Sequence, residues 1–148
     1  MEILQHFMAY AQAFEETYKD DDWSRLRQYF APDAVYDVQA KGFGCHLVGP
    51  DAIFAGIKKS LDGFDRRFDT RDVAITSPPE VIGDEMRVGW QMTYRKAGVP
   101  DFVLAGRSSA RYAGGRIARL VDSYEPEAER AFETWQRQSG MKIDASYV

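Results

Sequence analysis

A carboxylate, Asp37, lies inside the apolar, strand-like part of the segment YFAPDAVYDV (residues 29–38). Burial in an apolar cavity raises the pKa of a carboxyl group toward neutrality, and such a group can take a proton from a carbon next to a carbonyl. Strand alternation puts Val35 and Asp37 on one face and Tyr36 and Val38 on the other. Asp37 is therefore either a cavity acid, which is our hypothesis, or an ordinary solvent-facing or salt-bridged strand residue.

Two further groups of side chains could line a cavity. Trp90, Met92 and Tyr94 recur at every second residue, which predicts a stripe on one face of a strand. Such a stripe forms core or ligand wall, and Trp and Tyr keep polar groups that can orient a ligand. Asp122 and Tyr124 share a face of the last predicted strand. They are either cavity residues or a polar pair at the exposed end of the sheet.

Composition limits the class of protein. The 148 residues fit one domain, residues 1–148, and the 14% aromatic share must fill a core, an interface or a ligand cavity. The net charge of -4, without a basic stripe, argues against a nucleic-acid partner. One cysteine, no signal peptide and no apolar run long enough to span a bilayer predict a cytoplasmic protein without a membrane partner.

The histidines do not indicate a metal site. His6 and His46 lie 40 residues apart with no cluster of further ligands, so we expect no metal. His46 follows Cys45 directly, in a glycine-rich segment, and could line a cavity mouth. A nucleophilic Cys-His pair would need a third group that orients the histidine, and the sequence offers none.

The segments that must position these residues begin with helices. Apolar residues at helical spacing predict helices over residues 3–18 and 23–30, with the acidic run Asp20–Asp22 capping the second. Pro32 ends the second helix, and residues 34–38 follow as a short strand. Glycines then indicate an irregular loop up to a third helix, which starts at Pro50 and stops at Gly63.

Strand patterns dominate the second half of the chain. Strands are predicted over residues 66–76, 80–95, 102–112 and 116–125, with an interruption at Pro78-Pro79, and a short helix over residues 126–138. Gly114-Gly115 predicts a tight hairpin. Helices segregated from an antiparallel sheet make an α+β domain. We expect a curved antiparallel sheet wrapped around three helices, with an apolar pocket at the mouth of the cone.

Three segments carry a resemblance to a known superfamily. YFAPDAVYD after the second helix, VGPDAIFAGI at the third, and GGRIARLVDSYEPEA near the end resemble the nuclear-transport-factor-2-like superfamily. The chain looks closest to its ketosteroid-isomerase and SnoaL-like polyketide-cyclase group, over roughly residues 3–135. The resemblance implies the cystatin-like cone fold. It does not choose a function, because the superfamily mixes several kinds of enzyme with non-catalytic proteins.

The resemblance also assigns residues. Asp37 occupies the position of the isomerase general base, and Phe14 stands where that family has a helix-borne tyrosine. A phenyl ring cannot donate a hydrogen bond. Tyr10 and Tyr18, one turn to either side, are either substitutes for that tyrosine or core residues.

Arg107 falls where the isomerases carry a protonated acid. An arginine there could stabilise an oxyanion, bind a carboxylate, or pair with Asp37 and neutralise it. The apolar register of the strand, with Leu104 and Ala110, instead turns Arg107 outward unless a bulge intervenes.

Our first hypothesis is a cofactor-independent isomerase, cyclase or dehydratase-like enzyme that moves protons on a small apolar carbonyl compound. One alternative is a non-catalytic binder of an apolar metabolite. Another is a structural subunit resembling a dioxygenase small subunit. The opposite sheet face has a mixed polar and apolar surface, with Arg87, Gln91, Thr93 and Val103. Together with the resemblance, this surface predicts a homodimer through that face.

Overall fold

The structure is a computed structural model that describes residues 2–148. Within these residues the helices are α1 (Ile3–Asp20), α2 (Pro50–Gly63) and α3 (Ala128–Ser139), with two short 3₁₀ helices, η1 (Trp23–Tyr29) and η2 (Asp65–Arg67). The strands are β1 (Phe30–Gln39), β2 (Cys45–Val48), β3 (Thr70–Ile82), β4 (Glu85–Arg95), β5 (Phe102–Ala113) and β6 (Arg116–Tyr124).

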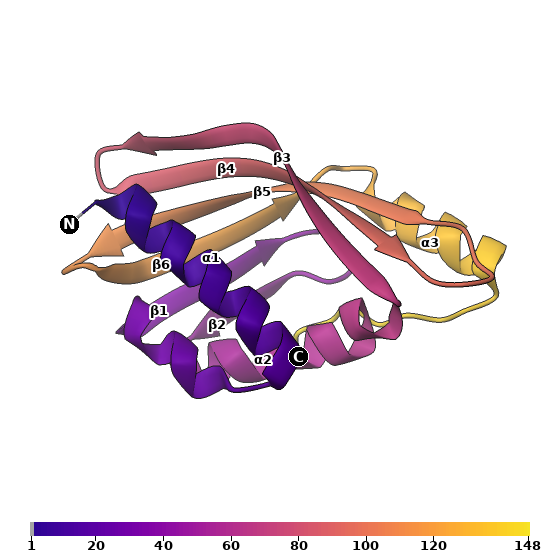
Figure 1. Cartoon of the computed structure of the whole chain (residues 1–148), viewed down its shortest axis with the longest axis horizontal. Helices are drawn as coiled ribbons and strands as arrows, with labels where there is room; N and C mark the ends of the chain where they lie inside the picture. Colours follow the sequence, from indigo (N-terminus) through magenta and orange to yellow (C-terminus); the bar gives the residue numbers. More distant parts are fainter. Residues whose placement is uncertain (1) are drawn as a thin grey trace.

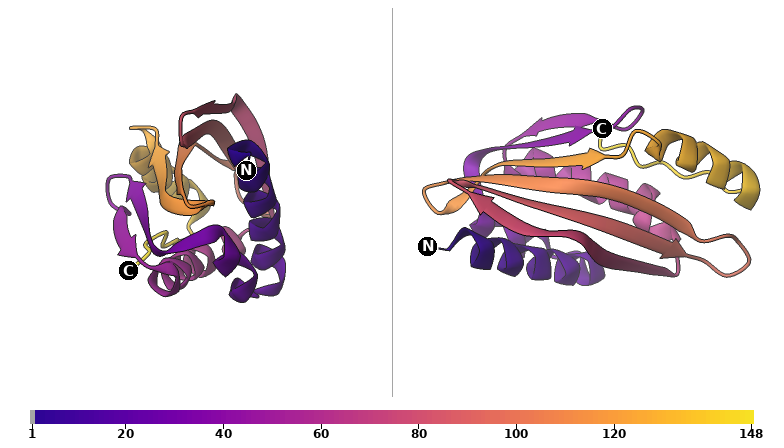
Figure 2. Two further views of the ribbon diagram at one scale, coloured as in Figure 1. Left: turned by 90° about the vertical axis from the view of Figure 1, so that its left-hand side faces the viewer. Right: turned by 90° about the horizontal axis from the view of Figure 1, so that it is seen from above.

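The strands form one curved sheet in the order β2-β1-β6-β5-β4-β3. Helices α1 and α2 lie against its concave side, and α3 lies at the far end of the same side (Figures 1 and 2). This confirms the predicted α+β cone. The sheet is mixed rather than purely antiparallel, because β1 runs parallel to β6 while the other neighbours are antiparallel.

Most predicted elements are present, and several details differ. The predicted second helix is the 3₁₀ helix η1, and β1 begins directly after it, so Pro32 lies inside the strand and does not end the helix. The strand predicted from residue 66 begins only at Thr70, after η2. The segment predicted as a loop before Pro50 contains an edge strand, β2, which pairs with β1. The predicted strand 80–95 is divided by a turn at Gly83, whose φ of +63° suits glycine. Pro78-Pro79 does not end β3, because β3 is an edge strand and its register with β4 shifts at this point. The Gly114-Gly115 hairpin is confirmed, with positive φ at both residues.

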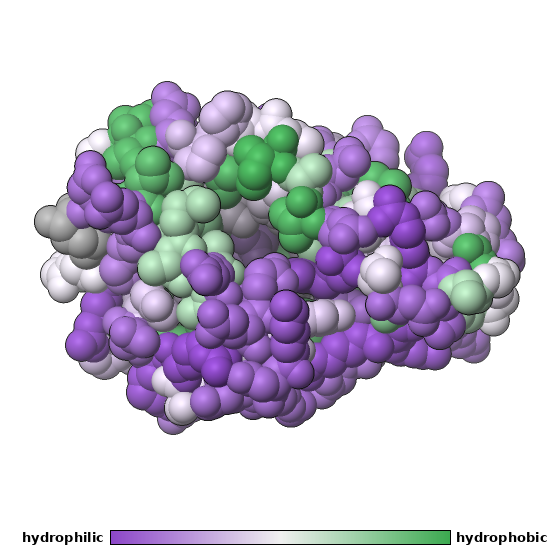
Figure 3. Space-filling model, viewed as in Figure 1, coloured by the Kyte–Doolittle hydropathy of each residue, from purple (hydrophilic) through white to green (hydrophobic). Residues whose placement is uncertain are grey.

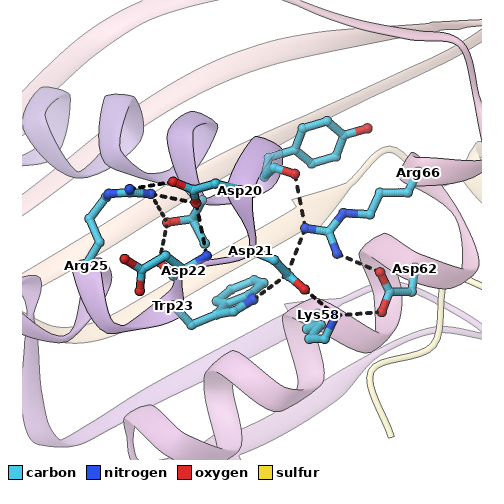
Figure 4. Close-up of polar contacts among 10 residues, drawn as sticks. Asp20, Asp21, Asp22, Trp23, Arg25, Lys58, Asp62 and Arg66 are labelled. Atoms are coloured by element: carbon cyan, nitrogen blue, oxygen red, sulfur yellow. Dashed lines mark hydrogen bonds and ion pairs between the residues drawn. The ribbon is translucent and has the colours of Figure 1, made fainter.

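The acidic residues at the end of α1, Asp20–Asp22, connect this helix to neighbouring helices by hydrogen bonds and ion pairs (Figure 4). The carboxylate of Asp22 accepts a hydrogen bond from the backbone N–H of Ser24 at 3.2 Å, which confirms the predicted cap of η1. Asp21 pairs with Lys58 on α2 at 2.7 Å and with Arg66 on η2 at 3.0 Å. These contacts hold the end of α1 beside the end of α2.

Two apolar clusters lie on the concave side of the sheet. One packs α1 and α2 on β1, β5 and β6, around Phe30 and Ile53. The other packs α3 on β4 and β5, around Phe102 and Trp135. The candidate site lies where these two clusters meet, and residues of both clusters line it.

Candidate functional site

A cavity of about 430 Å³ lies on the concave side of the sheet. Its walls come from α1, α2, η2, α3, β1, the inner faces of β3 to β6 and the segment that follows α3. Figure 3 shows a hollow between α1 and β3, bordered by apolar side chains. Met8 on α1 and Ile75 on β3 form part of this rim, and 55% and 59% of their surfaces are exposed. The opening therefore suits the entry of an apolar compound.

Strand alternation brings most of the predicted ligand-contacting residues into this cavity. Trp90, Met92 and Tyr94 line it from β4, and Asp122 and Tyr124 line it from β6. The predicted stripe on β4 is therefore part of the cavity wall. That these residues bind a ligand stays a prediction.

The side chain of Asp122 is held by neutral hydrogen-bond donors. Its Oδ2 accepts a bond from the hydroxyl of Tyr36 at 2.6 Å, and its Oδ1 accepts one from the hydroxyl of Ser108, also at 2.6 Å. Ser108 in turn accepts a bond from the indole N–H of Trp90 at 2.9 Å. These four side chains, from β1, β4, β5 and β6, are the Asp122 network.

The electrostatics of this network favour a protonatable group. Burial raises the pKa of Asp122, and the hydrogen bonds from Ser108 and Tyr36 offset the effect only in part. No cation is among the causes that shift this pKa. A carboxyl group with a raised pKa in a cavity is suited to exchange a proton with a ligand.

A second acid, Asp65, lines the cavity in a different setting. Its Oδ2 lies 2.9 Å from Nε of Arg71 and accepts a bond from the hydroxyl of Tyr94 at 3.2 Å. Arg71 also donates to Glu15 on α1 at 2.9 Å, and its side chain is only 11% exposed. Burial raises the pKa of Asp65, while the charge of Arg71 counteracts this rise. Asp65 is therefore part of an ion-pair cluster, unlike Asp122.

Asp37 does not face the cavity, so this prediction is wrong. Its side chain lies on the outer face of β1, where it pairs with Arg119 at 2.8 Å and with His46 of β2. Burial raises the pKa of Asp37, but the hydrogen bonds and charges of His46 and Arg119 outweigh this and lower it. The pKa is thus shifted opposite to the predicted direction, as expected for the salt-bridged alternative.

Arg107 is also absent from the cavity. It lies on the exposed outer face of β5, between Gly89 of β4 and Ser123 of β6. No bulge interrupts the β4–β5 register here, so Gly106 and Ser108 both face inward and Arg107, between them, faces outward, as a regular strand requires. The outward alternative weighed for this arginine is the observed one.

The aromatic residues of α1 divide into two groups. Tyr10 and Phe14 line the cavity, as predicted. Tyr18 is not among the lining residues. It packs beneath Arg71, whose guanidinium carbon lies 4.9 Å from the ring centroid, and donates to the backbone oxygen of Asp65 at 3.3 Å.

Several site residues were missed by the sequence analysis. Ser108 had a usable signal, because it has the strand parity of Leu104 and Ala110. Tyr36 had none, because apolar residues occur on both faces of its strand. The cluster of Asp65, Arg71 and Glu15 had none, because its members come from three separate elements.

No group of His, Cys, Asp and Glu within residues 2–148 has an arrangement that could hold a metal ion. His6 contacts the hydroxyl of Tyr112 at 3.0 Å, and His46 contacts Asp37. Nor is any helix in this part of the chain long and apolar enough to cross a membrane.

The sequence profile of a family described as the SnoaL-like domain matches residues 11–120. No curated protein matches the chain at a significant level.

Solved structures share the fold at low sequence identity. A putative isomerase from Bacillus subtilis has a TM-score of 0.67 at 15% identity, covering 97% of this chain and all of that one (100%). A protein of unknown function from Burkholderia pseudomallei K96243, described as NTF2-like, has a TM-score of 0.64 at 16% identity, with coverages of 92% and 98%. A putative polyketide cyclase from Xanthomonas campestris pv. campestris has a TM-score of 0.56 at 19% identity, with coverages of 91% and 97%. At these identities the similarity concerns the fold alone.

Proposed function

This chain belongs to the SnoaL-like domain family, and we propose that it is a cofactor-independent enzyme that moves a proton on a small apolar carbonyl compound. Asp122, rather than Asp37, is the acid and base of this reaction. The observation that supports the proposal is the Asp122 network, a cavity carboxyl group with a raised pKa and only neutral hydrogen-bond donors.

The proposed step needs only the carboxyl group and the ligand. The Asp122 carboxylate takes a proton from the carbon next to the carbonyl, and the electron pair of that C–H bond forms the enolate. The resulting carboxylic acid returns the proton to the same carbon, to another carbon of the conjugated system or to oxygen. Tyr36 and Ser108 hold the two carboxyl oxygens in place during both transfers.

A non-catalytic binder is the second candidate. The hydrogen bonds of the Asp122 network also fit this candidate, because each carboxyl oxygen of Asp122 already accepts a bond from a hydroxyl group of the protein. A buried carboxyl group with a purely structural role is satisfied in the same way. In that case the cavity holds an apolar metabolite and Asp122 only fixes Tyr36 and Ser108.

Deuterium exchange into a model ketone separates the two candidates. We would incubate 2-tetralone, an apolar bicyclic ketone with acidic C–H bonds, with the protein in deuterated buffer and follow exchange by mass spectrometry. The wild-type chain should accelerate exchange, and Asp122→Asn should lose at least about a hundredfold of this acceleration, the scale of a lost general base.

Asp37→Asn is the matched control, since it removes a carboxylate of the same type outside the cavity. It should retain the exchange activity. Equal activity of wild type and Asp122→Asn would contradict the proposal. Binding of 2-tetralone that quenches Trp90 fluorescence, without any exchange, would favour the binder.

A further inference from the structure

The segment after α3, Gly140–Val148, returns across the molecule to α2 without forming a helix or strand (Figure 1). Near its end, Tyr147 inserts its ring among the buried residues, and only 8% of its surface is exposed. Tyr147 and Ala145 both line the cavity. This segment is therefore a wall of the cavity although the helices and strands of the fold end before it.

The segment is held against α2 by specific contacts. The backbone N–H of Asp144 donates to the carbonyl of Gly63 at 3.0 Å, and the hydroxyl of Ser60 donates to the carbonyl of Ala145 at 2.7 Å. A Cβ atom at Gly63 would lie 2.2 Å from the carbonyl oxygen of Asp144. Gly63 is thus required for the close approach of this segment to α2.

Tyr147 contacts the Asp122 network through the ring of Tyr36. Its ring centroid lies 5.8 Å from that of Tyr36, the residue that donates to Asp122. Burial and the charge of Asp122 raise the pKa of the Tyr147 phenol, while the hydroxyls of Ser60 and Tyr36 act in the opposite direction. The phenol is consequently protonated at neutral pH, and it is a hydrogen-bond donor beside the proposed reacting group.

We propose that Gly140–Val148 is a specificity-determining wall of the cavity, and that the phenol of Tyr147 donates a hydrogen bond to the oxygen of a carbonyl ligand held against Asp122. The inference rests on the proposed function in that the ligand carries a carbonyl group. In a ligand whose C–H bond faces Asp122, the carbonyl oxygen is only two bonds from that carbon, and Tyr147 lines the same cavity. Such a donor stabilises the negative charge that develops on the oxygen as the proton leaves.

Two probes of the same shape test the hydrogen bond. 2-Tetralone carries the carbonyl oxygen, and 2-methylenetetralin has a CH₂ group in its place. The wild-type chain should bind the ketone more tightly than the hydrocarbon. Tyr147→Phe, which keeps the ring, should weaken ketone binding about tenfold, the upper range for one hydrogen bond. Its affinity for the hydrocarbon should stay within about twofold of the wild-type value.

The carbonyl stretching frequency of bound 2-tetralone gives an independent readout. It should shift to lower frequency in the wild-type complex, and the shift should shrink in Tyr147→Phe. Tyr112→Phe is the matched control, because it removes a phenol that contacts His6 and does not line the cavity. It should leave both the affinity ratio and the infrared shift unchanged.

Gly63→Ala tests the wall itself. Its methyl group displaces the segment at Asp144, so this variant should also lose the preference for the ketone while α2 stays folded by circular dichroism. The inference would be overturned by equal loss of both probes in Tyr147→Phe, by an unchanged ketone affinity, or by a wild-type chain that does not prefer the ketone. If Tyr147→Phe loses ketone affinity but wild type exchanges no deuterium, the proton-transfer proposal fails and the role of Tyr147 stands.

Discussion

Three aspartates of this chain differ because of their neighbours. Asp37 pairs with Arg119 and contacts His46 on the outer face, Asp65 pairs with Arg71 in the cavity, and Asp122 has hydroxyl partners alone. A cation stabilises the carboxylate form, whereas desolvation without a cation stabilises the neutral acid. The chemical role therefore depends on the neighbours of each carboxyl group rather than on its residue type.

Asp122→Asn should increase stability at neutral pH. The folded-state pKa of Asp122 lies above its unfolded value, so its favourable contribution is complete below about pH 3.9 and is lost as the pH rises through the folded pKa. At pH 7 the wild-type chain carries the cost of a desolvated charge that the amide avoids. Urea unfolding should show a gain of about 1 kcal/mol at pH 7 that narrows toward pH 4. A loss of stability at pH 7 would show that the carboxylate is stabilised in the fold.

Asp37→Asn should have the opposite effect. Its folded-state pKa is lowered, so its contribution is complete above about pH 3.9 and disappears as the pH falls through the folded value. Its side chain is 14% exposed, but Arg119 and His46 are largely open to solvent, so the loss at pH 7 should be only about 1 kcal/mol. Equal stability of mutant and wild type at pH 7 in low salt would argue against the ion pairs.

At the scale of elements, β4 to β6 position the site because their inner faces are continuous. Gly106 on β5 leaves the space in which the Trp90 ring crosses toward Ser108, since a Cβ atom there would lie 2.6 Å from the ring. Gly106→Ala should therefore displace Trp90 and break its hydrogen bond to Ser108. The tryptophan emission maximum should shift, and stability should fall by about 1–3 kcal/mol because of overpacking.

Gly98→Ala is a suitable control for that experiment, because a Cβ atom at Gly98 meets nothing within 4 Å, although its φ of +84° will cost some stability. It should leave the emission of Trp90 unchanged. An unchanged emission spectrum in Gly106→Ala would mean that Trp90 does not depend on this glycine.

Most of the helices and strands could be predicted from sequence periodicity. Which side chains of β1 face the helices could not be predicted. The spacing of Trp90, Met92 and Tyr94 is unambiguous because their strand alternates with polar residues. On β1, apolar residues occur on both faces, with Val35 on the same side as Asp37 and Val38 on the side of Tyr36. Only the parallel pairing with β6, a long-range contact, decides which face meets the helices. The Asp65 cluster and the wall formed by Gly140–Val148 also depend on contacts between residues far apart in the sequence, so they could not be predicted either.

At the scale of the whole molecule, the outer face of the sheet remains available for assembly. Val103 lies on this face, because its neighbour Leu104 points inward, and it is 48% exposed. We predict a homodimer through this face, and light scattering should report twice 16.8 kDa at micromolar concentration. Val103→Glu should dissociate it.

Val81→Glu provides the control for the dimer. Val81 is also exposed, but it pairs with the inward-facing Met86 and so lies on the concave side of the sheet. It should leave the dimer intact. A wild-type mass of 16.8 kDa across the micromolar range would reject this mode of assembly.

The identity of the pocket acid is tested most directly by NMR titration of the aspartate side-chain carboxyl carbons in the folded protein. Asp122→Asn and Asp37→Asn assign the two signals by their disappearance. We predict that Asp122 titrates above the ordinary aspartate value of about 3.9 and that Asp37 titrates below it. Addition of 2-methylenetetralin should raise the pKa of Asp122 further by excluding water and leave that of Asp37 unchanged. A lowered pKa for Asp122, or a raised pKa for Asp37, would contradict the assignment of Asp122 as the proton-transferring group.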